Sequence, residues 1–426
     1  MKIAIDTADL DCERIDGTRV YIQNVLKYLG ELALEDEFFL LHKTEYNNLL
    51  RLAEFKNYQD KSLGRGFWWT QIKFAREVRK LNSDVCWMPI QQIPFLQSIK
   101  SKVNPTSLKL RGTRSQRSIK YVVTIHDLAF KFFLDHFPLI DRLKINFYTD
   151  VAVKRADRII AISESTKRDL IRLYPEINEN KIVVVHHGFD RENFEQEFRE
   201  EEKVQFLKKW KLDYNKDHQN KINLRNGKIK QQFPTSPNRL CGTSANGGYL
   251  LYVGAIQPRK DLVTLIRAFN MLKQSQIMDV SDLKLVLVGE RAWKSESTLR
   301  EIERSEFKND IIVTGKVDFK ELAMFFRWAK VFVFPSLYEG FGIPILEAMA
   351  SKTPVVVADN SSLLEVGGEA VLKFKTGNSD DLEEQLRKLL GNKDLQDKMV
   401  EQGLEQIKKF SWEKCAKETL EVLKGI

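Results

Sequence analysis

The sequence predicts an α/β protein made of two doubly wound, Rossmann-like domains. Strand-like and helix-like segments alternate along the first 190 residues, and the alternation starts again at residue 249. The strand-like segments are apolar throughout, as in "LKLVLVG" and "VFVFPS", which is typical of parallel strands buried on both faces. A chain of 426 residues is also longer than one ordinary domain and comfortable for two.

The first half supplies the elements of one domain. Apolar runs predict strands, and apolar residues spaced three or four apart predict helices. The expected strands are 1–6, 37–43, 84–90, 120–128, 158–165 and 181–188, and the expected helices are 18–33, 67–82, 142–156 and 166–174.

The second half repeats the pattern. The expected strands are 249–255, 283–290, 310–315, 331–336, 354–360 and 370–374, and the expected helices are 261–275, 320–329, 343–350 and 381–392. Between the halves the chain is polar and ends in "FPTSPNRLCGTSANGG". We therefore predict an N-terminal domain over 1–190, a polar linker or insertion over 191–248, a C-terminal domain over 249–405, and a final helix over 406–426 that packs back towards the N-terminal domain.

Composition excludes several classes of protein. No apolar run approaches the roughly 18 residues of a membrane span, and the N-terminus reads as a strand, so the expected location is cytoplasmic. The four cysteines (Cys12, Cys86, Cys241 and Cys415) form no CxxC pair, which argues against a disulfide framework or a structural zinc site. The histidines show no HExxH spacing.

The net charge of +9 is concentrated in two segments. Residues 97–120 carry seven Lys/Arg and no acid, and residues 203–240 carry ten Lys/Arg and two acids. Two interpretations stay open: solvated loops, or contact with an anionic membrane surface or polyanion. The basic amphipathic segment 65–80 favours the membrane for the first domain. Nucleic acid is not expected, because aromatic residues do not interleave with the charges.

The stretch "PSLYEGFGIPILEAMA", residues 335–350, carries the first candidate site. A glycine-rich loop joins a buried strand to a helix with Pro344 in its first turn. Backbone N–H groups at such a helix start bind phosphate, and Gly340 and Gly342 allow close approach and unusual φ. Glu339 and Glu347 flank the loop. As an acid and nucleophile pair they would indicate a glycosidase, and as a dipole complement and a solvated loop residue they would do nothing chemical.

A second candidate cluster favours a diphosphate ligand. Arg259 and Lys260 lie in the turn between a strand and a helix, where Arg can grip phosphate oxygens in pairs and Lys supplies a point charge. Ordinary surface charge is the alternative. No GxxxxGK[ST] is present, which argues against a P-loop enzyme, and no GxGxxG follows a strand, which argues against a nicotinamide enzyme.

These residues closely resemble the family-4 retaining glycosyltransferases of the GT-B fold. The resemblance rests on "LYVGAIQPRKDLVTLIRAF", on the E-x7-E spacing within 311–372 and on the terminal "FSWEKCAKETLEVL". It continues in the first half through "VVTIHDLAF" and "VVVHHGFD". "PRK" after the first strand of the second domain is similar to mannosyltransferase-like members. The fold implied has two Rossmann-like domains facing each other across a cleft.

The resemblance implies a role for each candidate. Glu347 should bind the donor ribose, while Glu339 and the backbone from Gly340 through Phe341 to Gly342 should hold the transferred sugar and the diphosphate. Further expected site residues are Arg259 and Lys260 on the leaving diphosphate, His126 on the donor sugar, and Gly17 and Gly254 near the phosphates. No metal and no cofactor are implied; the donor is a GDP- or UDP-linked sugar and the acceptor a glycan or a lipid-linked molecule.

The implied reaction is metal-independent, retaining hexosyl transfer, with mannose favoured, in polysaccharide or glycolipid assembly. The chain departs from the family in two places: Ala255 stands where many relatives have arginine, and "DGTRVY" has one glycine where many have two. Asp9–Asp11 ("DLD") resembles the metal motif of the other glycosyltransferase fold but lacks its context. A nucleotide-sugar epimerase and a non-catalytic partner subunit of a glycan-assembly complex are the alternatives.

Overall fold

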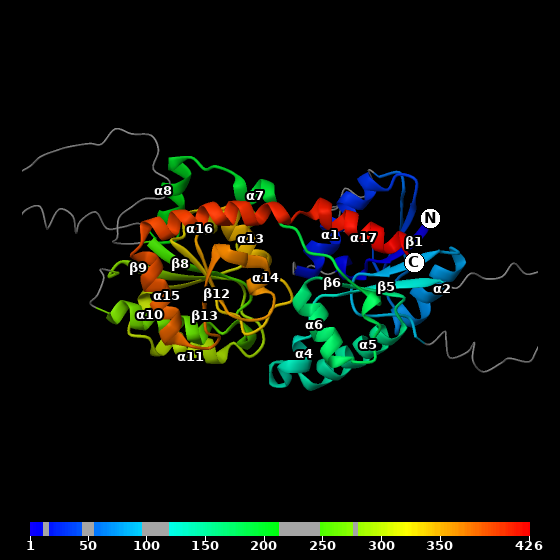
Figure 1. The fold of residues 1–426 in the computed structure, drawn as a ribbon, viewed down its shortest axis with the longest axis horizontal. Helices are drawn as coiled ribbons and strands as arrows, with labels where there is room; N and C mark the ends of the chain where they lie inside the picture. The colour runs from blue at the N-terminus through cyan, green and yellow to red at the C-terminus, as the bar shows by residue number, and fades with distance from the viewer. Residues whose placement is uncertain (12–16, 45–54, 96–118, 213–247, 276–279) are drawn as a thin grey trace, which may run out of the picture. The chain divides into compact units, whose positions relative to one another are not determined.

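A computed structural model describes residues 1–11, 17–44, 55–95, 119–212, 248–275 and 280–426. The chain forms two compact units (Figure 1). Unit 1 comprises Met1–Phe189, Glu339–Phe341 and Phe410–Ile426; unit 2 comprises Asp190–Tyr338 and Gly342–Lys409.

Unit 1 contains a seven-stranded parallel sheet in the order β3-β2-β1-β4-β5-β6-β7. The order turns back beside β1, which makes the edge next to β1 and β4 the expected place for a ligand. The strands are β1 (Lys2–Asp6), β2 (Glu37–His42), β3 (Tyr58–Ser62), β4 (Val85–Met88), β5 (Lys120–Ile125), β6 (Arg158–Ala161) and β7 (Ile182–Val184).

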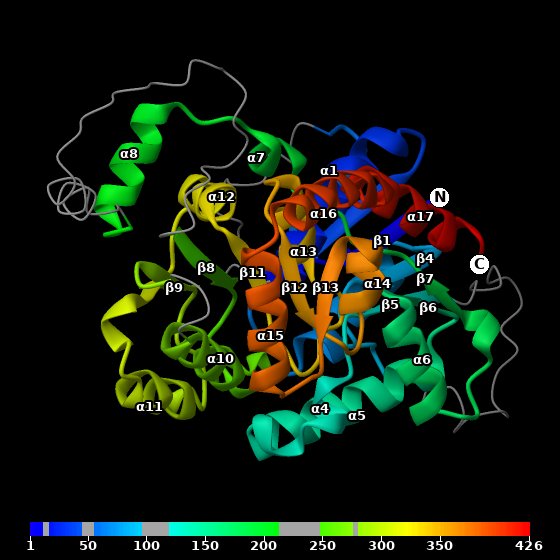
Figure 2. The ribbon, with the colours of Figure 1, turned by 60° about the vertical axis from the view of Figure 1, so that its left-hand side comes forward.

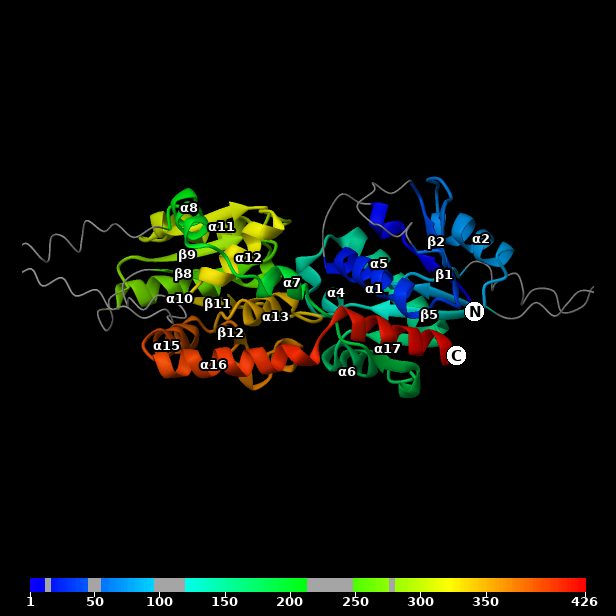
Figure 3. The same cartoon turned by 90° about the horizontal axis from the view of Figure 1, so that it is seen from above.

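Helices cover both faces of this sheet. On one face, α1 (Gly17–Leu32) packs against the C-terminal helix α17 (Trp412–Lys424), as seen from above in Figure 3. Residues of α2 (Ala75–Lys80), α5 (Leu139–Arg155) and α6 (Glu164–Leu173) join alternate strand residues in one buried cluster on the other face. The short helix α4 (Ala129–Phe132) and the 3-10 turns η1 (Ala8–Asp11), η4 (Leu134–His136) and η5 (Glu179–Lys181) complete the unit.

Unit 2 contains a six-stranded parallel sheet in the order β10-β9-β8-β11-β12-β13, part of which Figure 2 shows side by side. The order turns back beside β8, so the carboxyl ends of β8 and β11 flank the switch point where ligands bind in such sheets. The strands are β8 (Gly248–Val253), β9 (Leu283–Val288), β10 (Ile311–Gly315), β11 (Val331–Phe334), β12 (Val355–Ala358) and β13 (Val371–Phe374).

Helices again lie on both faces of the second sheet (Figure 1). One face carries α10 (Leu262–Gln274), α11 (Glu296–Arg304) and α15 (Ser379–Leu390), and the other carries α13 (Ile343–Ala350) and α16 (Lys393–Gln406). The remaining elements are α12 (Phe319–Trp328), α14 (Leu363–Gly367) and the 3-10 turns η6 (Pro258–Lys260), η7 (Lys308–Asp310), η8 (Gly368–Ala370) and η9 (Ile407–Lys409). Both units therefore have the predicted doubly wound architecture.

The segment predicted as a linker begins differently from that expectation. Residues 190–212 belong to unit 2 and contain α7 (Arg191–Glu195) and α8 (Glu200–Lys209). Phe194 and Phe206 are buried, and Phe206 meets Phe325 at a centroid distance of 4.7 Å. Charged residues predominate between these aromatics, so the composition of the segment did not predict its apolar face. The rest of the predicted linker, 213–247, lies outside the described residues.

The predicted helix 67–82 also starts differently. A π-helical turn, η3 (Thr70–Phe74), precedes α2, and Trp68 has a φ of 52°. Within the described ranges, no helix combines the length and the apolar character needed to cross a bilayer.

Candidate functional site

In unit 2, the turn after β8 carries the two predicted cations. Gly254 directly follows β8 and has a φ of 146°, which favours glycine, and its N–H donates to the Val288 carbonyl at 2.9 Å. The 3-10 turn η6 then places Arg259 and Lys260 at the carboxyl edge of the sheet, and both are half-buried. The structure thus brings Gly254, Arg259 and Lys260 to the switch point of this unit.

Arg259 ties this turn to the loop after β11. Its guanidinium donates to the Tyr338 carbonyl, and its own carbonyl accepts from the Leu337 N–H at 2.8 Å. Lys260 Nζ lies 5.3 Å from the centre of the Phe334 ring, at the end of β11. Arg259 therefore has a structural role that the sequence did not indicate, in addition to its positive charge.

The loop leads into α13 through a glycine with a special conformation. Gly342 is the N-cap of α13 with a φ of 120°, and as a glycine it has no side chain to cap the helix. Pro344 stands in the first turn, as expected. Of the first three helical residues, Pro344 has no N–H and Ile345 donates to the Gly342 carbonyl at 3.0 Å, which leaves the Ile343 N–H and the positive end of the helix dipole to face an anion.

Glu347 lies just after the first turn of α13. It is the fifth residue of the helix and is half-buried. Burial raises the pKa of Glu347 to about 8, and the negative charge of Asp190 raises it further. Burying an acid so that it stays neutral near pH 7 costs stability. A position that keeps such an acid is therefore typically a functional one.

In unit 1, the three residues Glu339–Phe341 lie against His126. A Cβ added at Gly340 would lie 2.0 Å from the His126 carbonyl oxygen and 3.0 Å from Asp127 Cβ. Position 340 therefore requires glycine because another part of the backbone lies against it, whereas position 342 requires glycine because its φ is positive. Glu339 is 8% exposed. The structure thus brings two predicted catalytic residues, His126 and Glu339, into neighbouring positions.

His126 follows β5 and is held by the backbone after β4. Its Nε2 lies 2.8 Å from the Pro89 carbonyl oxygen. Because a carbonyl only accepts, Nε2 carries the proton and the other ring nitrogen, Nδ1, accepts in the neutral form. Asp127 Oδ1 accepts from the Ala129 N–H at 3.0 Å, so Asp127 caps the following segment.

His187 is a residue near the site that the sequence analysis did not single out. It stacks on Tyr21 with a centroid distance of 4.7 Å and lies 5.6 Å from the His126 ring and 5.2 Å from the Phe341 ring. Burial, with the neighbouring His126 and His186, holds the pKa of His187 well below its ordinary value, so the ring is neutral. The only sequence signal was the pair of histidines in "VVVHHGFD".

Gly17 and the "DLD" motif lie near the start of unit 1. Gly17 begins α1 directly after residues outside the described ranges, and a Cβ added there would meet no atom within 4 Å. Asp11 of the "DLD" motif accepts from the Lys43 and Thr44 N–H groups at 2.8 and 3.3 Å. Among the described residues, no three histidine, cysteine or acidic side chains gather in a way that could hold a metal ion.

Comparison with known proteins agrees with this architecture. Residues 16–193 match the model "Glycosyltransferase Family 4", and residues 242–406 match "Glycosyl transferases group 1". O-antigen chain mannosyltransferase B of Escherichia coli is 35% identical over 177 residues, which span 42% of this chain and 46% of that relative. An uncharacterized glycosyltransferase of Methanocaldococcus jannaschii is 27% identical over 94% of this chain and 92% of its own length.

Solved structures share the fold. A glycosyltransferase from Rickettsia africae aligns with a TM-score of 0.68 and 16% identity, covering 100% of this chain and 98% of its own. Anabaena Alr3699/HepE in complex with UDP-glucose aligns with a TM-score of 0.67 and 14% identity over the whole of both chains. The two family models together span most of the chain, and they match its two halves in order. The chain therefore belongs to the family-4 glycosyltransferases, with the GT-B fold.

Proposed function

We propose that the protein is a retaining hexosyltransferase that moves a sugar, with mannose favoured, from a nucleotide-diphosphate sugar to a glycan or lipid-linked acceptor in polysaccharide or glycolipid assembly. The observation that carries the proposal is the turn with Arg259 and Lys260, joined by hydrogen bonds to the loop that leads into the start of α13. The mannosyltransferase among the relatives supports the choice of sugar. The epimerase alternative receives no support from the relatives reported above.

The proposed reaction needs no metal ion. The bond between the sugar anomeric carbon and the diphosphate oxygen breaks, and the acceptor hydroxyl oxygen forms its bond to the same carbon on the same face. The departing diphosphate oxygen takes the acceptor proton. Arg259, Lys260 and the N-terminal end of α13 would stabilise the negative charge that develops on the diphosphate. This is the work that a metal ion performs in other phosphate chemistry.

The other residues are assigned supporting roles. Glu347 would accept hydrogen bonds from the donor ribose, and Glu339 would bind hydroxyls of the transferred sugar. His126, whose Nε2 is hydrogen-bonded to the Pro89 carbonyl, would contact the same sugar. The backbone from Gly340 through Phe341 to Gly342, with Gly254, leaves room for phosphate oxygens, and Gly17 would approach them from the start of α1.

Binding of the donor and the pKa of Glu347 can be tested together by thermal unfolding. A GDP- or UDP-sugar present at a hundred times its Kd should raise Tm by about 3 °C, because about 2.7 kcal/mol is divided by the unfolding entropy of a 426-residue chain. Glu347→Gln should lose most of this shift. The folded protein binds a proton on Glu347 up to about pH 8, whereas the unfolded chain releases it near pH 4.5. Stability of the wild type should therefore fall as pH rises from 4.5 to 8.

Without a ligand, the Glu347→Gln variant should lack the loss of stability that Glu347 causes in the wild type as pH rises. Glu347→Gln cannot ionise, so its Tm should exceed that of the wild type at pH 8, and the difference should vanish near pH 4.5. A donor shift of wild-type size in Glu347→Gln would contradict the assigned role. No shift with any GDP- or UDP-sugar in the wild type would contradict the proposed function.

We also propose that unit 1 binds an anionic membrane surface. Phe67, Trp68 and Ile72 are 83%, 49% and 47% exposed beside the basic residues of 65–80. Exposed aromatic and aliphatic side chains near Lys and Arg are typical of interfacial binding. The second basic segment named for this role, 97–120, lies almost wholly outside the described residues.

Flotation with phosphatidylglycerol vesicles tests the membrane proposal. The double variant Phe67→Ser/Ile72→Ser should bind at least about tenfold more weakly, because two apolar side chains no longer enter the interface. Leu34→Ser is the matched control, since Leu34 is 75% exposed but lies in the turn after α1 and not in the 65–80 segment. Equal flotation with neutral phosphatidylcholine, or no effect of the double variant, would refute the proposal.

A further inference from the structure

Unit 1 contains a pocket of about 370 Å³ apart from the residues assigned to the donor. Its lining comes from the carboxyl edge of the sheet and from α5. Lys43 follows β2, Arg65 follows β3 and Gln92 follows β4, whereas Tyr148 lies on α5. The other lining residues are Gly66, Trp68, Trp69, Thr70 and Gln71. Its volume is within the range of about 300–1,000 Å³ that small-molecule sites occupy.

The wall formed by the 63–74 segment is held by the half-buried ammonium group of Lys73. Lys73 Nζ donates to the carbonyls of Leu63, Gly64 and Arg65 at 3.0, 3.3 and 2.8 Å. Trp68 then adopts a φ of 52°, which is rare for a bulky residue, and the chain continues into the π-helical turn η3. Strained backbone and π-turns concentrate at functional positions.

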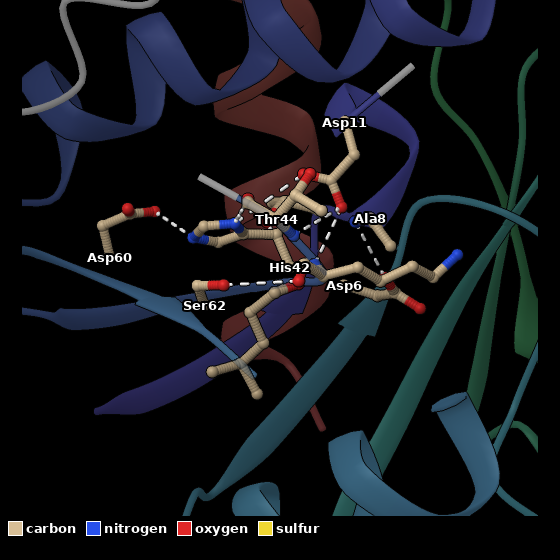
Figure 4. Close-up of polar contacts among 10 residues, drawn as sticks. Asp6, Ala8, Asp11, His42, Thr44, Asp60 and Ser62 are labelled. Atoms are coloured by element: carbon tan, nitrogen blue, oxygen red, sulfur yellow. Dashed lines mark hydrogen bonds and ion pairs between the residues drawn. The ribbon is translucent and has the colours of Figure 1, made fainter. Parts of the chain in front are cut away.

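A polar network that includes Asp11, His42 and Asp60 lies at the ends of β2 and β3 (Figure 4), and it also holds the backbone of Lys43. Asp11 Oδ2 accepts from the Lys43 N–H at 2.8 Å, and Ser62 Oγ donates to the Lys43 carbonyl at 3.3 Å. His42 lies between two carboxylates, with Nε2 3.0 Å from Asp60 and Nδ1 3.7 Å from Asp11. Lys43 Nζ consequently sits 5.5 Å from the centre of the Trp69 ring.

The lining combines positive charge with aromatic surface and contains no acid. Lys43 and Arg65 supply the charge, and Trp68, Trp69 and Tyr148 supply flat apolar faces on which a sugar ring can pack. Trp69 is 4% exposed, and its indole N–H is buried without a hydrogen-bond partner among the described residues. An unpaired buried donor is costly unless an oxygen from a ligand or water reaches it.

The pocket shares its edge of the sheet with His126. Pro89, whose carbonyl accepts from His126, and Gln92, which lines the pocket, both follow β4. The side-chain amide of Gln71 is engaged in the wall, donating to the Ile93 carbonyl at 3.0 Å and accepting from the Phe95 N–H at 2.7 Å. Recognition of a ligand therefore falls to Lys43, Arg65 and the indole N–H of Trp69.

Resting on the proposed sugar transfer, we propose that this pocket is the acceptor subsite and takes a sugar that carries a phosphate group. The phosphate pairs with Lys43 and Arg65, the sugar packs on the aromatic faces, and the Trp69 N–H donates to one of its oxygens. A lipid diphosphate-linked sugar and a free sugar phosphate share this chemistry. Phe67 is exposed and stacks on Trp68, which lines the pocket, at a centroid distance of 5.4 Å. An exposed aromatic side chain beside the pocket favours the lipid-linked ligand.

Calorimetric titration of the full chain, without a donor, tests the proposal. The probes are N-acetylglucosamine 1-phosphate, N-acetylglucosaminyl diphosphate linked to farnesol, and inorganic phosphate. Both sugar phosphates should bind more tightly than inorganic phosphate. Lys43→Met and Trp69→Phe should each raise their Kd at least about tenfold, the effect of one lost hydrogen bond to a charged or buried group.

Arg76→Met is the matched control, because Arg76 is an exposed cation on α2 outside the pocket, and its Kd should equal that of the wild type. Tighter binding of the farnesyl compound than of the free sugar phosphate would support the proposal and name the lipid-linked source. Unchanged Kd values in both Lys43→Met and Trp69→Phe, or no binding of either sugar phosphate, would overturn it. If no nucleotide sugar raised the Tm of the wild type, only the proposed function would be contradicted, because binding of the sugar phosphates to the pocket is measured without a donor.

Discussion

Gly340→Ala should reduce sugar transfer at least about a hundredfold while the protein stays folded. The added methyl group would lie 2.0 Å from the His126 carbonyl oxygen, so the backbone must move by more than an ångström to accommodate it. Glu339 precedes this residue directly, and displacements of about 1 Å at a catalytic group cost about 10²-fold in rate. Transfer to an acceptor should be measured together with Tm and circular dichroism.

The matched control for this substitution is Gly391→Ala. Gly391 is exposed and has a φ of −85°, a conformation that alanine adopts freely, so transfer should be unchanged. Near-normal transfer by Gly340→Ala would show that the contact with His126 does not position Glu339. A fall in Tm equal to that of a core cavity would instead assign Gly340 to folding.

Lys260→Met should also reduce transfer at least about a hundredfold. Methionine keeps the packing of the stem over Phe334 but removes the charge that the proposal places on the leaving diphosphate. Removing one donor to a developing negative charge costs about 10²–10³ in kcat. The loss should appear mainly in kcat, because the charge on the diphosphate increases as the bond to the sugar breaks.

Lys388→Met removes an exposed lysine from the last turn of α15 and serves as the control. It leaves the net charge equal to that of Lys260→Met, so any general effect of charge on donor encounter is the same in both variants. Equal kcat values for Lys260→Met and Lys388→Met would refute the role of Lys260. Arg259 is less suited to this test, because its guanidinium also holds the Tyr338 carbonyl.

The sequence predicted the architecture well because each strand is a continuous apolar run. A strand such as Val331–Phe334 can only be buried on both faces, and this requires a parallel sheet with helices on each side. The special glycine at 342 and the proline at 344 were also readable, since each follows from local backbone geometry. Local rules therefore located the loop where α13 begins.

Other features of the site depended on contacts between distant segments. Gly340 is required by a carbonyl more than 200 residues earlier in the chain, the pKa of Glu347 depends on burial and on Asp190, and Lys43 reaches Trp69 through a network on neighbouring strands. Residues 190–212 fold with unit 2 because two phenylalanines between charged residues find partners there.

By itself, the sequence determined two doubly wound units, the glycine-rich turn and the family to which the chain belongs. These follow from hydrophobic periodicity and from residues close together in the chain. Only the tertiary structure decided that His126 lies against Gly340, that Arg259 binds the loop before Glu339, and that a cationic aromatic pocket forms beside β2 and β4. The reason is physical: close contact, desolvation and charge pairing depend on distances in space, which a linear order of residues does not contain.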